Sequence, residues 1–282
     1  FLRDFFRAIW LLPSQIRAFK LARRRRKVEQ LLELTTLAKE EGDLLRAKKF
    51  AQKGLKLHPS NVLLKTLLAE LLTELKEYDE GEKVYLELLN DKHVAFIGSK
   101  GLATQAIKKA KTEQALQLLY HTTKLAPKSI WAYRNLFNLE VKESHWDNSL
   151  VALEKLTKLE PSEKPVFNFY VVHILLAKSY QEEAKGNLSI ALNLAKRAYH
   201  LDKQFIPAGI EFLKLLKDMG RIRASKSLAE SIWQVAPSED LALLWMSFVD
   251  GSKMTEQVKW AEKLIMLQPQ NSEGLYIYAR TA

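Results

Sequence analysis

The 282-residue chain contains no cysteine, which excludes disulfide bonds and any cysteine-ligated metal or iron–sulfur site. The absence also fits a reducing compartment. Ten glycines and eight prolines are few for this length, so long irregular loops are not expected. No uninterrupted run of about 18 apolar residues occurs, so no segment is predicted to span a membrane by itself. Hydrophobic residues still make up 47% of the sequence, which is enough for a continuous core.

Motifs of catalysis, metal binding and phosphate binding are missing as well. The six histidines are scattered, without His-x-x-x-His or His-Glu-x-x-His spacing, so no metal site is predicted. Glycine-rich dinucleotide or phosphate cradles and a Gly-x-Ser-x-Gly elbow do not occur, and Gly98-Ser-Lys-Gly101 lacks the spacing of a phosphate loop. We therefore expect no catalytic residues, no cofactor and no enzymatic activity.

Basic residues are concentrated at the start of the chain. Residues 1–27 contain nine basic residues and one acidic residue, so this segment carries +8 of the net charge of +11. The remaining residues are nearly neutral, and an extended basic groove is not expected. Nucleic acid is therefore not an expected partner, although an RNA-binding arm in residues 1–27 is an alternative.

The basic segment has the pattern of an amphipathic helix on a membrane surface. Phe5, Ile9 and Leu12 follow a helical repeat, and Pro13 is expected to bend or end this helix. Aromatic residues followed by an arginine cluster are typical of the interfacial end of a membrane anchor or of a helix on anionic lipid. The residues predicted at the membrane surface are Arg3, Arg7, Trp10, Arg23, Arg24, Arg25, Arg26 and Lys27. The alternative is a solvated basic helix that caps the rest of the fold.

The chain begins with Phe1 rather than methionine, so we expect a further segment upstream. If that segment spans a membrane, the arginine cluster predicts that residues after it lie on the cytoplasmic side. A signal peptide is not predicted, because charge is embedded in the apolar part and follows it.

A nine-residue phrase that ends in proline recurs along the chain. It reads Ala-x-x-x-Leu-x-Leu-x-Pro at residues 51–59 and returns in related form at residues 153–161, 229–237 and 261–269. Pro127 closes a similar segment 34 residues before Pro161. A period near 34 residues without a strand pattern predicts stacked helix–turn–helix units. The pattern resembles the tetratricopeptide repeat and predicts an all-α, right-handed solenoid with a basic amphipathic N-terminal helix.

Alignment on the closing proline predicts about seven repeats within residues 28–271. The predicted ranges are 1–27 for the basic juxtamembrane segment, 28–60, 61–94, 95–128, 129–162, 166–204, 205–238 and 239–271 for the repeats, and 272–282 for the start of a further or capping helix. About eight extra residues lie around Pro161 to Pro165. Glycines in the turns (Gly42, Gly186 and Gly220) are expected in the left-handed conformation that ends a helix. Small residues are expected where helices cross closely, at Ala47, Gly81, Ala115, Ala191 and Ser225.

The first helix of each repeat is expected to line the concave face, where partners of such solenoids usually bind. The predicted partner-binding residues are Lys100, Thr104, Lys108, Arg134, Asn138, Lys142, His173, Tyr180 and Lys214. Lysine, arginine and asparagine could hold a carboxylate or an extended peptide backbone, and the alternative is a solvated helix surface. The large aromatics Trp131, Trp146, Trp233, Tyr133 and Phe137 are interpreted as core between repeats. Protein partners are expected, and the sequence defines no oligomeric state.

Three segments have a narrower resemblance. They read Ala-Phe-Ile-Gly-Ser-Lys-Gly-Leu-Ala at 95–103, Ala-Pro-Lys-Ser-Ile-Trp-Ala at 126–132 and His-Trp-Asp-Asn-Ser-Leu-Val-Ala-Leu-Glu at 145–154. In this order, and after an arginine-rich segment, they are similar to the HemY family of bacterial inner-membrane proteins. The resemblance implies a membrane-tethered repeat protein that faces the cytoplasm and scaffolds or regulates enzymes of late haem (porphyrin) biosynthesis. It does not imply porphyrin oxidation.

Two other functions are open from the sequence. One is a general scaffold for envelope assembly, for instance of lipopolysaccharide or the cell wall. The other is an enzyme or a haem carrier that uses His173 or Tyr180.

Overall fold

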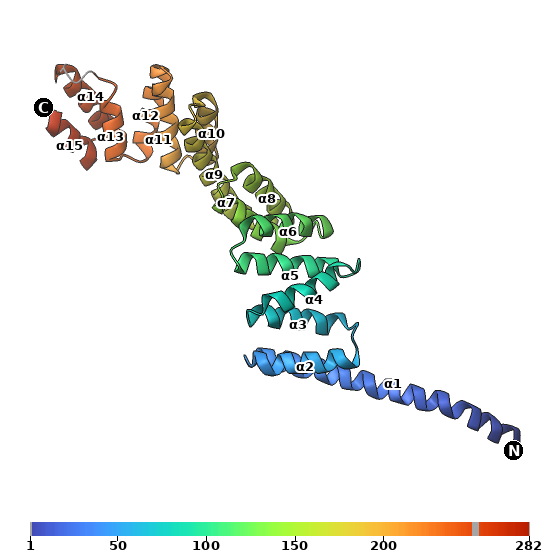
Figure 1. Cartoon of the computed structure of the whole chain (residues 1–282). Coiled ribbons are helices and arrows are strands. Elements are labelled where there is room, and N and C mark those ends of the chain that lie inside the picture. Colours follow the sequence, from blue (N-terminus) through green and yellow to red (C-terminus); the bar gives the residue numbers. More distant parts are fainter. Residues whose placement is uncertain (1, 250–253, 282) are drawn as a thin grey trace. The chain divides into compact units, whose positions relative to one another are not determined.

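The computed structural model describes the backbone of residues 2–249 and 254–281, and the side chains of residues 18–249 and 254–281. These residues form fifteen α-helices and one short 3-10 helix, without a strand (Figure 1). The predicted all-α class is confirmed, and most consecutive helices within each part of the chain pack on one another as in an α-solenoid.

The chain divides into two compact units, residues 1–139 and 140–282. The helices that begin in the first unit are α1 (Leu2–Glu40), α2 (Leu44–Leu57), α3 (Val62–Glu74), α4 (Tyr78–Leu89), α5 (Ala95–Lys108), α6 (Thr112–Leu125) and α7 (Ile130–Lys142). The helices of the second unit are α8 (Trp146–Leu159), η1 (Pro161–Glu163), α9 (Lys164–Ala184), α10 (Leu188–Leu201), α11 (Ile206–Asp218), α12 (Ile222–Val235), α13 (Glu239–Met246), α14 (Met254–Leu267) and α15 (Ser272–Thr281). Most of them are similar in length, and each predicted repeat range holds two consecutive helices.

Left-handed residues end the first helix of a pair at regular intervals. Gly42, Gly186 and Gly220 have φ of +80°, +80° and +73°, which confirms the prediction for these turns. Where glycine is absent, other residues take the same conformation: Lys76 (φ +63°), Ala110 (φ +53°) and Ser144 (φ +58°). The first four of these positions, 42, 76, 110 and 144, are evenly spaced along the sequence. The interval from Ser144 to Gly186 is longer, because α9 is 21 residues long and holds the extra residues near Pro165.

Small buried residues lie where the paired helices cross. Ala47, Ala115, Ala191 and Ser225 are 0% exposed, and Gly81 is buried in α4. All five residues are thus buried, as expected of small residues at positions where helices cross closely.

Helix α1 joins the basic segment to the first repeat without a break. Pro13 is expected to bend or end the helix, but the backbone is helical on both sides of it, so the helix does not end there. A proline removes one backbone hydrogen bond, but the good helix formers around it (leucine, isoleucine, arginine and lysine) sustain the helix. The side chains of residues 2–17, among them Arg3, Arg7 and Trp10, lie outside the described residues.

The described part of α1 is exposed before Val28 and has a buried face from Val28 onward. Residues 18–27, which include the cluster from Arg23 to Lys27, are exposed. Val28, Leu31, Thr35 and Ala38 are buried at helical spacing, and Val28 and Ala38 pack into clusters with residues of α2 and α3. In the residues that can be described, no helix is long and apolar enough to cross a membrane.

Candidate functional site

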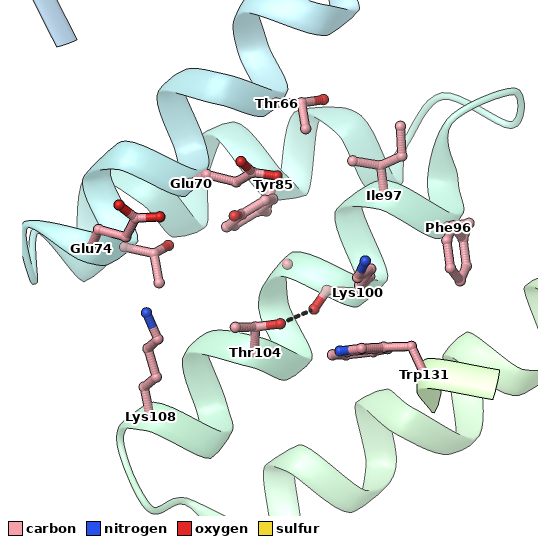
Figure 2. A pocket seen from close by; sticks show the side chains of 12 residues that line it. Thr66, Glu70, Glu74, Tyr85, Phe96, Ile97, Lys100, Thr104, Lys108 and Trp131 are labelled. Atoms are coloured by element: carbon pink, nitrogen blue, oxygen red, sulfur yellow. Dashed lines mark hydrogen bonds between the residues drawn. The ribbon is translucent and has the colours of Figure 1, made fainter. Parts of the chain in front are cut away.

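A cavity of about 420 Å³ lies in the first unit between α3, α4, α5 and α7 (Figure 2). Its lining residues are Thr66, Glu70, Thr73 and Glu74 of α3, Tyr85 of α4, Phe96, Ile97, Lys100, Gly101, Thr104 and Lys108 of α5, and Trp131 of α7. Three predicted partner-binding residues, Lys100, Thr104 and Lys108, are thus brought together on one face of α5. The repeat pattern did not predict the acidic residues opposite them.

Tyr85 is a buried part of the cavity wall, and Gly101 leaves room for its ring. A Cβ atom at Gly101 would overlap the Tyr85 ring, and one at Gly98 would lie 2.6 Å from the Tyr85 carbonyl oxygen. The two glycines therefore allow α5 to lie against α4. Burial raises the pKa of Tyr85 to about 12. The Gly98-Ser-Lys-Gly101 segment is a helix-packing feature within α5.

The acidic wall belongs to α3. The Lys39 ammonium of α1 lies 2.6 Å from a Glu70 oxygen and 3.6 Å from a Glu74 oxygen. Partial burial alone would lower the pKa of Lys39, but its hydrogen bond to Glu70 and the two carboxylate charges raise it overall. Lys39 therefore shares its positive charge between two carboxylates, and this wall keeps a negative excess.

The basic wall belongs to α5. The Lys100 ammonium lies 5.2 Å from the centre of the Trp131 ring, within the range of a cation–π contact. The Thr104 hydroxyl donates to the Lys100 carbonyl at 2.9 Å, as the dashed line in Figure 2 marks. Among the side chains that the structure describes, Lys108 has no ion-pair partner and Lys100 has no carboxylate partner. The cavity thus has one wall with two unneutralised ammonium groups and one wall with a negative excess.

The other predicted partner-binding residues lie outside this cavity. Arg134 and Asn138 are exposed on α7, and Lys142, His173, Tyr180 and Lys214 belong to the second unit. The structure therefore gathers three of the nine predicted residues in one cavity and distributes the rest.

His173 of α9 contacts two aromatic rings, one on the same helix and one at the start of α11. Its ring centre lies 4.0 Å from that of Phe169 and 4.4 Å from that of Phe205. His173 Nδ1 is 2.8 Å from the Phe169 carbonyl oxygen, and because a carbonyl only accepts, Nδ1 carries the proton of this bond. The remaining ring nitrogen, Nε2, is then the acceptor of the neutral ring.

A buried carboxyl lies near Tyr180 and Lys214. Glu211 is only 3% exposed, and one of its oxygens has no hydrogen-bond partner among the described residues. Burial, followed by the negative charge of Glu183, raises the pKa of Glu211 to about 7. The Lys214 ammonium lies 2.8 Å from a Glu183 oxygen. Burial also raises the pKa of Tyr180, with the Glu211 charge as the second cause.

Of the large aromatics interpreted as core, Trp233 is fully buried, whereas Trp131 is only partly buried. Trp233 is 0% exposed, and its indole N–H donates to the Leu264 carbonyl at 3.0 Å. Trp131 instead lines the cavity beside Lys100, because it lies near the start of the first helix of its pair. Within the described ranges, no group of three or more histidine, aspartate or glutamate side chains could hold a metal ion.

No protein-family model and no curated protein matches the chain. Among solved structures it is similar to Naa15/Naa10 bound to HypK-THB, with a TM-score of 0.59 and 15% identity over 90% of this chain and 38% of that one. It is also similar to a tetratricopeptide repeat protein from Parabacteroides merdae ATCC 43184 (TM-score 0.45, 16% identity, 91% and 99% covered). A third similar structure is YrrB, a TPR protein with an unusual peptide-binding site (TM-score 0.41, 17% identity, 63% and 88% covered). At these identities the likeness concerns the helical-repeat fold alone.

Proposed function

We propose that this chain is a non-catalytic adaptor that holds a segment of another protein in the cavity between α3, α5 and α7. A helical-repeat scaffold of this kind serves protein–protein contacts through its extended concave surface. The observation that carries the proposal is the pair of ammonium groups, Lys100 and Lys108, that face the cavity without a carboxylate partner among the side chains described. Beside them, Trp131 offers apolar surface for a side chain of the partner.

A photo-cross-linking experiment tests the adaptor. A photoreactive phenylalanine replaces Thr104 in the cavity, and in a control it replaces the exposed Gln52 of α2. In native membranes that contain the protein with its natural upstream sequence, we expect one protein to be captured from position 104 and not from position 52. Equal capture at both positions, or no protein product at 104, would reject the cavity as the docking site.

The adaptor is further proposed to be tethered at the cytoplasmic face of a bacterial inner membrane through α1. Residues 18–27 of this helix are exposed, and each of the five basic residues from Arg23 to Lys27 would contribute about 1 kcal/mol near an anionic surface. The proposal is supported by this cluster together with the resemblance to the HemY family. Co-flotation with phosphatidylglycerol vesicles should be strong for the chain and weak for an Arg24→Glu/Arg25→Glu variant. Equal flotation of both proteins would count against the tether.

The resemblance also supports partners among the enzymes of late haem biosynthesis. The three segments that carry it include Lys100 and Trp131, two residues of the cavity. If the proposal is right, the protein captured from position 104 is an enzyme of this pathway. Capture of cell-wall or lipopolysaccharide enzymes alone would instead assign the adaptor to envelope assembly.

A haem or porphyrin carrier is a second candidate function, and His173 is the observation that favours it. Its Nδ1 proton is engaged by Phe169, which leaves Nε2 as a possible axial ligand beside two aromatic rings. Titration with haem should then give a Soret shift that His173→Ala abolishes. A titration without such a shift would leave the adaptor as the proposed function.

A further inference from the structure

Lys100 and Lys108 lie on the same face of α5, eight residues apart. With a rise of about 1.5 Å per residue, their Cα atoms are separated by about 12 Å along the helix axis. Thr104 lies midway between them and also lines the cavity. The cation–π contact with Trp131 holds Lys100 toward the start of this row. The backbone positions of the two lysines are therefore spaced by about 12 Å along one wall of the cavity.

We infer that the cavity binds an extended acidic segment whose carboxylates are four residues apart, an inference that rests on the proposed adaptor function. An extended chain advances about 3.3 Å per residue, so about 12 Å corresponds to between three and four residues. Side chains of an extended chain alternate in direction, and only residues an even number apart face the same wall. Carboxylates at i and i+4 therefore reach Lys100 and Lys108, whereas carboxylates at i and i+3 point to opposite sides.

The residues between the two carboxylates meet different surroundings. The side chain at i+2 points toward Thr104, where a small or apolar residue fits against the Trp131 ring. Side chains at i+1 and i+3 point away from α5, where Glu70 and Glu74 of the opposite wall disfavour further acids and suit basic residues. The matching sequence is acid–x–apolar–x–acid, in which x is neutral or basic.

The acidic wall also selects among polyanions. A nucleic acid or an anionic lipid surface carries negative charge on every side and would bring part of it against Glu70 and Glu74. A peptide can place carboxylates on one face and neutral or basic groups on the other. Charge complementarity with the two walls therefore favours a peptide segment as the occupant.

Peptide binding to the full 282-residue chain tests the proposed spacing of four residues between the carboxylates. The probes are fluorescein-labelled nine-residue peptides with aspartates at the third and seventh positions, at the third and sixth positions, or with asparagines in place of both aspartates. Fluorescence anisotropy should show that the first peptide binds about tenfold more tightly than the other two, as two partly exposed ion pairs allow. Equal affinity of the two aspartate isomers would overturn the inference.

Charge-matched variants show whether the two lysines are responsible. Lys100→Glu/Lys108→Glu should remove the preference for the first peptide. Lys49→Glu/Lys53→Glu, which makes the same charge change at positions of α2 outside the cavity, should keep it. If circular dichroism shows that the cavity variant has lost its helices, Lys100→Gln and Lys108→Gln replace it, and each should reduce the preference severalfold. A preference that survives loss of either lysine would overturn the inference.

Competition experiments separate the peptide from other anions and from the adaptor proposal. Single-stranded DNA and phosphatidylglycerol vesicles are tested as competitors of the first peptide. If either displaces the peptide, and does so only where Lys100 and Lys108 are intact, the choice of a peptide occupant is overturned. The carboxylates four residues apart in a protein captured from position 104 can be removed by mutation. If that protein still binds, the inference on spacing is overturned and the adaptor function is kept. Absence of any captured protein would instead reject the adaptor function.

Discussion

The buried carboxyl of Glu211 provides a test of the electrostatics of the second unit. Replacing Glu211 with Gln keeps the shape of the side chain and removes a charge that burial and Glu183 disfavour. The change leaves the ion pair between Lys214 and Glu183 in place. We expect Glu211→Gln to be more stable than the unchanged protein at pH 8 and nearly equal to it at pH 5.

The direction and size follow from the pKa of Glu211, which rises from 4.5 to about 7 on folding. Between these values the folded chain binds more protons than the unfolded chain, so the free energy of unfolding falls as the pH rises. A shift of this size corresponds to at most about 3 kcal/mol, all of it present above the folded-state pKa. Because Glu183 shares in the titration, about 1–3 kcal/mol is expected at pH 8 and less than about 1 kcal/mol at pH 5.

Urea denaturation followed by circular dichroism at pH 5, 6, 7 and 8 measures this difference. Glu113→Gln, at an exposed position of α6 in the first unit, controls for the replacement of a carboxylate by an amide. The reasoning is refuted if the difference between Glu211→Gln and the unchanged protein is the same at pH 5 and pH 8. A lower stability of Glu211→Gln at pH 8 would refute it as well.

Two further predictions concern the backbone. At Gly98 a Cβ would lie 2.8 Å from the Leu89 Cα, so Gly98→Ala should lower the free energy of unfolding by about 1–3 kcal/mol despite better helix propensity. Gly81→Ala, whose Cβ meets mainly the end of the Gln105 side chain, should cost less, and equal urea midpoints for the two variants would contradict this account. Ala110→Gly should raise thermal stability by up to about 1 kcal/mol, because Ala110 has φ of +53°. A lower melting temperature would show that this strain is absent.

The repeat pattern of the sequence predicts much of the fold because each repeat packs mainly on its neighbours. The regular period places the turns, and glycines at three of them identify the left-handed position directly. Ala110 shows the limit of this signal, since an alanine in the same conformation has no local marker. Pro13 shows the converse, because a residue that usually ends a helix is accommodated within one.

Only one wall of the cavity could be predicted from the sequence. Lys100, Thr104 and Lys108 follow from the first-helix face of a repeat, since residues four apart share one side of a helix. Glu70 faces them from a helix of the preceding repeat, and Tyr85 reaches the wall only because Gly101 has no side chain. These contacts depend on how closely particular helices approach one another, and the helical periodicity of the sequence does not predict that distance.

The continuity of α1 has a mechanical consequence. Between the exposed residue Phe19 and the buried residue Val28, the chain advances by about 1.5 Å per residue in one direction, or about 14 Å in all. A disordered linker of the same length would let the repeats sample many positions, which would lower their effective concentration at any one fixed binding partner. A continuous helix is stiff, so a partner or surface that binds its exposed end also fixes the distance and the orientation of the first repeat.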